Sequence, residues 1–304
     1  MLDTTRAAAW YRIQSVLAAS TAGVIGSLWD TIDPDNIASS WRAQLPLATD
    51  AVAYGSRRAA SGSSAYVAAT IADEGVDPLN VTVNVSRLVS RPVTSARLAV
   101  PMLRTLERIG RGDSVTESLA SGRLLATVIG AQTTRDTARD AVGIAQITEP
   151  RVHGWVRYLV TPSCGRCAVL AGRVYAWSDG FARHPSCDCQ HRSIVDGQMP
   201  AARSSVEGSA SDYFGSLSEA DQNKYFGTGT ADSIRAGGNL NRAVNADRNM
   251  WRERSPRRSV GDLPRPIVNA VMAQAKGDRL KAVARLRDYG LIDEAARQAV
   301  AAHQ

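Results

Sequence analysis

The sequence is poor in aromatic residues, and it has no long uninterrupted apolar run. Aromatic residues make up 6% of the chain, although 44% of its 304 residues are hydrophobic. The apolar content therefore comes mainly from Ala, Val and Leu, which favours packed helices over a β-sandwich. No segment reaches the roughly 18–20 apolar residues that a membrane-spanning helix requires. A secretory signal is also missing at the start, where Asp3 precedes any basic residue. We expect a soluble protein made in a cytoplasm.

Cysteine is also scarce, and charge gives little guidance. The formal net charge of +7 favours polyanions such as nucleic acid, but moderate basicity also keeps a protein soluble. All four cysteines lie between residues 164 and 189. In a reducing cytoplasm, clustered cysteines are more often metal ligands or redox groups than disulfides. The chemistry of this sequence is therefore expected in that one segment.

The pattern along the chain predicts a mainly α protein with three consecutive parts. Residues 1–150 are expected to form a helical scaffold that binds a partner. Residues 151–195 are expected to form a small β-rich module clamped by Cys and His. Residues 196–304 are expected to form a basic region of short helices, with two or three of them after residue 267.

Local signals predict several elements within these parts. One apolar stripe is expected along the first helix, from Trp10, Ile13, Leu17, Val24 and Leu28. The segment DPDN at residues 33–36 predicts a helix start, with Asp33 as the cap. Ser114 and Glu117 have the spacing of a capping box. Two strands are predicted, in RVHGWVRYLVT and in GRVYAW, because both are rich in β-branched and aromatic residues.

The cysteine segment reads Cys-x-x-Cys and then His-x-x-Cys-x-Cys-x-His. Two thiolates of a Cys-x-x-Cys turn can bind one ion, and tetrahedral zinc needs four such ligands. The segment offers six candidates, namely Cys164, Cys167, His184, Cys187, Cys189 and His191. Four cysteines, or three cysteines with one histidine, would form a closed structural site. We therefore expect structural zinc that stabilises a module with a small core.

Three other interpretations of this segment were considered. Two disulfides are chemically possible, with three connectivities. A thioredoxin-like dithiol at Cys164 and Cys167 is less consistent, because that fold begins with a βαβ unit and helices precede this strand. A nucleobase deaminase is excluded, because His153 is followed by Gly154 and Trp155 and the His-x-Glu acid is missing.

These same residues resemble the signature of the phage Mu F-like minor head proteins. That pattern is Cys-x-x-Cys, a Leu-x-Gly turn, an aromatic residue and then His-Pro-x-Cys-x-Cys. The matching residues are Cys164, Cys167, Leu170, Gly172, Tyr175, His184, Pro185, Cys187 and Cys189. The segments SWRAQLPLATDAVAYGSRRAASGSSAYVAATIADEGVDP and LSEADQNKYFGTGTADSIRAGGNLNRAVNADRNM are similar to the regions that flank the signature in versions from phages of actinobacteria.

The resemblance implies a structural minor capsid protein that acts in head morphogenesis at or near the portal vertex. Its expected partners are the portal protein, the major capsid protein, or both, and packaged double-stranded DNA. Its expected location is the virion, in the head interior or at the portal vertex, after assembly in the host cytoplasm. A strip of arginines at 252–265 is expected to contact DNA or an acidic partner, or else to be a solvated linker. The strip consists of Arg252, Arg254, Arg257, Arg258 and Arg265.

Two alternative functions remain open at this point. Proteins of the actinobacteriophage type are frequently labelled capsid maturation proteases. A serine protease needs a base beside its nucleophile, and the sequence has neither Gly-x-Ser-x-Gly nor His-Glu-x-x-His. We therefore expect no catalytic residues and keep the protease as the alternative. A nucleic-acid-binding zinc module is the third possibility.

Overall fold

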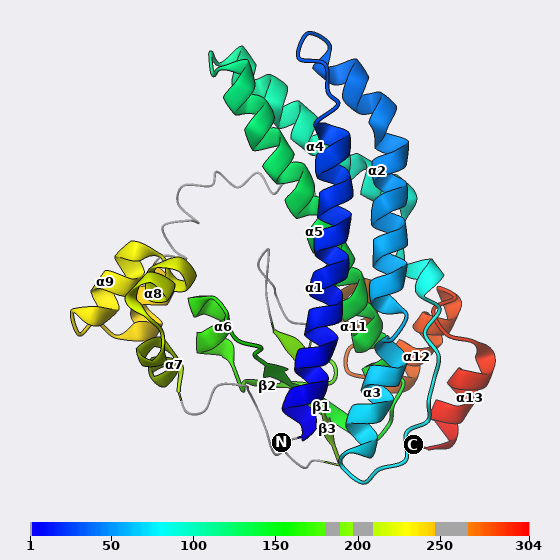
Figure 1. Cartoon of the computed structure of the whole chain (residues 1–304). Coiled ribbons are helices and arrows are strands. Elements are labelled where there is room, and N and C mark those ends of the chain that lie inside the picture. Colours follow the sequence, from blue (N-terminus) through cyan, green and yellow to red (C-terminus); the bar gives the residue numbers. More distant parts are fainter. Residues whose placement is uncertain (1, 180–188, 197–208, 247–266, 304) are drawn as a thin grey trace. The chain divides into compact units, whose positions relative to one another are not determined.

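The computed structural model describes residues 2–179, 189–196, 209–246 and 267–303. Its architecture is mainly helical, with one small antiparallel sheet, which confirms the expected fold class (Figure 1). The chain forms two compact units, and each draws on several stretches of sequence. One unit contains residues 1–11, 70–77 and 150–277, and the other contains residues 12–69, 78–149 and 278–304. We call them the sheet unit and the bundle unit. The division into three consecutive parts stays a prediction.

The bundle unit contains long helices and several shorter elements. Its elements are α1 (Leu2–Trp29, from Arg12 on), α2 (Ile37–Ala60), α3 (Ser63–Ala72, up to Ala69), the 3-10 turn η1 (Val85–Leu88), α4 (Arg91–Gly110), α5 (Val115–Ile147), α12 (Arg279–Asp288) and α13 (Glu294–Ala302). Ser114 caps α5 by accepting the N–H of Glu117, as the capping spacing predicts. Within the described residues, no helix combines the length and the apolarity needed to cross a membrane.

Two tryptophans anchor the core of the bundle unit. The rings of Trp29 and Trp41 pack with their centroids 4.7 Å apart, and the Trp41 indole N–H donates to the Leu98 carbonyl at 2.8 Å. Around them pack the buried residues Ile25, Ile32, Ile37, Ala48, Val52, Leu98, Met102 and Ala126. Because both indoles are buried and their N–H groups are bonded, this pair orients α1, α2, α4 and α5 with few aromatic residues.

Glycines lie where these helices pack most closely. A Cβ atom at Gly130 of α5 would lie 2.1 Å from Cδ1 of Ile25, and one at Gly55 of α2 would lie 2.1 Å from Oγ1 of Thr21. Both distances are shorter than any real contact of a Cβ atom. α1 therefore packs its Thr21 and Ile25 directly on the backbones of its neighbours, and only glycine fits there.

The expected apolar stripe of α1 is only partly right, because Trp10 is buried and Leu28 packs against the core of the bundle unit while two other members lie in solvent. Ile13 and Val24 are exposed, whereas the buried face runs through Gln14, Ala18, Thr21, Ile25 and Trp29. The physical reason is that Gly55 and Gly130 let the backbones of α2 and α5 approach the side of α1 that carries Thr21 and Ile25. The expected cap at Asp33 is also misplaced. Its carboxylate accepts the N–H of Asp35 and the side-chain amide of Asn36, while α2 begins at Ile37 with Asn36 at its N-cap.

The sheet unit contains the three strands and the shorter helices. Its elements are β1 (Val152–Tyr158), α6 (Gly165–Leu170), β2 (Val174–Ala176), β3 (Gln190–Val195), α7 (Ala210–Ser216), α8 (Glu219–Phe226), α9 (Thr228–Arg235), a helical stretch at 240–246 and α11 (Ile267–Ala275). The strand order is β2-β1-β3, and both pairings are antiparallel. β1 and β2 confirm the two predicted strands, and β3 was not predicted. α11, α12 and α13 confirm the short helices expected after residue 267.

The start of α1 and the segment 70–77 join this sheet. Tyr158 and Val160 form a small core with Ala7, and Ala8 and Tyr11 pack against it. Arg192 of β3 is buried and forms an ion pair with Glu74 at 2.6 Å, and Arg6 pairs with Asp73 at 2.7 Å. Apolar contacts and ion pairs thus fix these distant stretches of sequence to the sheet.

Candidate functional site: the cysteine cluster

The Cys-x-x-Cys turn lies between β1 and β2. Cys164 occupies the N-cap position of α6, with extended backbone angles, and its carbonyl accepts the N–H of Ala168 at 3.0 Å. This geometry turns the chain at once from extended backbone into helix. A Cβ atom at Gly165 would lie 2.6 Å from Cδ1 of Phe226, so the turn needs glycine there because an aromatic ring covers it.

Tyr213 of α7 fixes the residue before the turn. Its hydroxyl accepts the N–H of Ser163 at 2.7 Å and donates to the Ser163 carbonyl at 3.0 Å. Tyr213 and Ser163 are both buried. Buried hydrogen bonds of this kind each contribute about 1 kcal/mol, and one left unmade costs more. The position of Cys164 therefore depends on a helix about fifty residues further along the chain.

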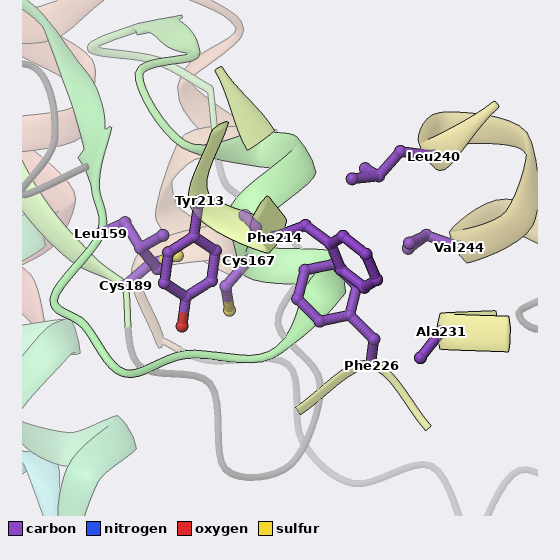
Figure 2. Close-up of a cluster of buried hydrophobic side chains, with 10 residues drawn as sticks. Leu159, Cys167, Cys189, Tyr213, Phe214, Phe226, Ala231, Leu240 and Val244 are labelled. Carbon is purple, nitrogen blue, oxygen red and sulfur yellow. The ribbon is translucent and has the colours of Figure 1, made fainter. Parts of the chain in front are cut away.

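Cys167 and Cys189 meet in one buried cluster. Figure 2 shows both thiols beside Leu159 and Tyr213, and the rings of Phe214 and Phe226 pack nearly at right angles, with an interplanar angle of 84°. Cys167 and Cys189 are fully buried, and the half-buried Cys164 packs against the same cluster. The buried members are Leu159, Cys167, Ala168, Cys189, Tyr213, Phe214, Phe226, Ala231, Leu240 and Val244. The cysteine segment and the helices from 210 to 246 thus share one core.

His191 lies in β3, opposite Arg157 of β1. Its ring stacks on Trp155 with centroids 4.4 Å apart, and Trp155 stacks on Tyr175 of β2 at 4.3 Å. The guanidinium of Arg157 lies over the Tyr175 ring at 5.7 Å. Three stacked rings thus cross all three strands on one face of the sheet. His191 was expected as a metal ligand, which stays a prediction, and its ring takes part in this stack.

The described residues match a zinc site in the kind of ligand that they offer. Cys164 and Cys167 of the Cys-x-x-Cys turn and Cys189, just before β3, contact one core, and thiolates are common zinc ligands. Among the described residues, no three Cys, His, Asp or Glu side chains form a group arranged to hold a metal ion. Two expected ligands, His184 and Cys187, lie outside the described residues. All five residues of the arginine strip also lie outside them.

The aromatic half of this cluster was missed by sequence reasoning. Tyr213, Phe214 and Phe226 lie in a stretch expected only to form short helices. One signal was present, since Ser209 and Asp212 form a complete capping box that orients α7. A cap predicts where a helix begins, but not which core it joins.

Comparisons with protein-family models, with curated proteins and with solved structures found no match to this chain.

Proposed function

We propose that this chain is a structural minor capsid protein of a tailed bacteriophage that acts in head morphogenesis at or near the portal vertex. The observation that carries the proposal is the cysteine cluster itself. The residues that resemble the phage Mu F-like signature include Cys164, Cys167 and Cys189, and these three converge on one core. Such an arrangement suits a stabilising clamp within a scaffold.

The core around the clamp supports a structural role. Cys167 and Cys189 are fully buried among aromatic and aliphatic side chains, and Tyr213 fixes the residue that precedes Cys164. A nucleophilic cysteine needs a partly exposed, electropositive environment, whereas buried cysteines are inert. We propose that Cys164, Cys167 and Cys189, together with Cys187 or His184, bind one zinc ion. Such an ion would link the turn after β1 to the start of β3.

The proposed partners follow from the same role. The bundle unit offers long helices for contacts with the portal protein or the major capsid protein. The arginine strip from Arg252 to Arg265 is proposed to contact packaged DNA or an acidic partner. Phosphate contacts of this kind weaken as the salt concentration rises.

Co-expression tests this role directly. The full chain is produced with the portal protein and the major capsid protein encoded in the same genome, and particles are separated by sedimentation. We expect the intact chain to sediment with the particles and the capsid protein to keep its length. A shortened capsid protein that appears only when this chain is present would favour the maturation protease. A chain that stays at the top of the gradient would contradict the structural role.

A further inference from the structure

The solvent-facing side of α1 carries an apolar stripe. Ile13, Val16 and Val24 are 53%, 67% and 46% exposed. Steps of three or four residues link Ile13, Val16, Ser20, Val24 and Ser27, so all five lie on one face of the helix over about 21 Å. Exposed apolar residues that share one helix face mark an interaction surface more often than isolated exposed residues do.

This stripe belongs to a helix that is apolar on both sides. No charged residue occurs between Arg12 and Asp30, and the opposite face packs into the bundle unit through Ala18, Thr21 and Ile25. A helix whose outer face meets only water is normally charged or polar there. The exposed face of α1 is therefore expected to be covered by a partner with a matching pattern.

The stripe is symmetric about Ser20. Val16 lies four residues before Ser20 and Val24 four residues after it, while Ile13 and Ser27 lie seven residues before and after. Two copies of α1 related by a two-fold axis through Ser20 would run antiparallel. Val16 of each copy would then face the partner's Val24, and serine would face serine at the axis. The small side chains at the centre allow the helices to approach closely.

The charges at the two ends favour the same orientation. Arg12 and Asp30 are both exposed. In the antiparallel arrangement, the partner's Asp30 would lie opposite residue 10. Arg12 is two residues from that position, which is about 3 Å along the helix axis. The Asp30 carboxylate accepts two hydrogen bonds from Arg123, at 2.7 and 2.9 Å, and retains further acceptor capacity. A parallel pairing would place like charges together at each end instead.

We propose that the exposed face of α1 is a self-association surface, on which a second copy of this chain docks through its own α1 in antiparallel orientation. The occupant is a second copy because Val16 would meet the partner's Val24 and Arg12 would lie near the partner's Asp30. This inference does not depend on the role in the phage head.

A charge-exchange experiment on the full chain tests this proposal. Val16→Lys and Val24→Glu are made singly and together, and sedimentation velocity measures dimer formation up to ~100 μM, a range that detects weak association. Each single change sets a charge against a valine and is expected to weaken dimerisation by about tenfold or more. The double variant places each lysine opposite a glutamate of the partner, and its dimerisation is expected to recover.

The control is Leu124→Lys, which alters an equally exposed apolar residue on α5. It is expected to dimerise like the wild type, and circular dichroism should show that all variants keep their helix content. The proposal would be overturned if the wild type were monomeric or if the single variants dimerised like the wild type. It would also be overturned if Leu124→Lys weakened dimerisation as much as Val16→Lys does. A double variant no better than the single ones would overturn the antiparallel register.

Discussion

Replacing Gly122 with alanine is expected to lower the free energy of unfolding by about 3 kcal/mol, at the upper end of the usual cost of overpacking. A Cβ atom there would lie 2.1 Å from Oγ1 of Thr105 and 2.4 Å from Cζ2 of Trp29. Trp29 has little freedom to move, because it is buried and its indole N–H donates to the Leu119 carbonyl at 3.1 Å. Urea unfolding followed by circular dichroism measures the change.

Gly23→Ala is the matched control for this prediction. Gly23 also lies inside a long helix, but no atom lies within 4 Å of its Cβ position. Alanine should therefore raise the stability there by up to about 1 kcal/mol, through helix propensity alone. Opposite signs for the two variants are the expected result. If both changes stabilise the protein, α1, α4 and α5 do not pack as closely as the structure shows.

Replacing Arg279 with methionine is expected to cost about 3 kcal/mol, because it leaves a buried carboxylate without a counter-charge. Arg279, at the start of α12, is buried and donates a hydrogen bond to the carbonyl of Glu149. The Glu149 carboxylate is buried too and accepts the N–H of Leu79 at 3.1 Å. Burial lowers the pKa of Arg279 to about 10, although the charge of Glu149 opposes this shift. Arg285→Met, on the exposed side of α12, should change the stability by less than about 0.5 kcal/mol.

The cost of Arg279→Met should also depend on pH. Burial raises the pKa of Glu149, while the N–H groups of Leu79 and Asn80 and the charge of Arg279 oppose the rise. Without Arg279, this folded-state pKa rises further. A carboxyl group with a raised folded-state pKa contributes its full stability below its unfolded pKa, and that contribution is lost as the pH rises through the folded-state value. The deficit of Arg279→Met should therefore be largest at pH 7 and shrink as the pH falls toward about 5.

Urea unfolding at several pH values follows this deficit. Combining Arg279→Met with Glu149→Gln removes the titrating carboxyl group, so the deficit of this double variant should be smaller and should not vary over the same pH range. A deficit that grows on acidification would show that Glu149 is not the buried charge left behind.

Local patterns predicted most of the elements of this fold. The capping residue Ser114 and the two β-branched segments are sufficient to place the start of α5, β1 and β2, because helix and strand preferences act over a few residues. The buried face of α1 could not be predicted in the same way. α1 is apolar on both faces, and the face that packs is selected by Gly55 and Gly130 on other helices.

In the candidate site, too, the local sequence predicted one part and residues far along the chain determine the other. The spacing from Cys164 to His191 identified the segment, but its burial depends on Tyr213 and Phe226. The spacing of the cysteines does not predict that these two rings pack against them. β3 was missed because Gln190, His191, Arg192 and Ser193 look like a polar loop, whereas the structure buries all four of them in a strand.

The proposed clamp is tested most directly by the metal content of the full chain, purified without chelator or reductant, together with a count of reactive thiols. We predict about one zinc ion per chain, because four thiolate or imidazole ligands bind one tetrahedral ion. Cys189→Ser should lose the metal. His191→Phe should keep it, because a phenyl ring preserves the stack on Trp155 and the thiol ligands remain. A chain without metal but with reactive thiols, or one that loses its zinc only in His191→Phe, would contradict the clamp formed by Cys164, Cys167 and Cys189.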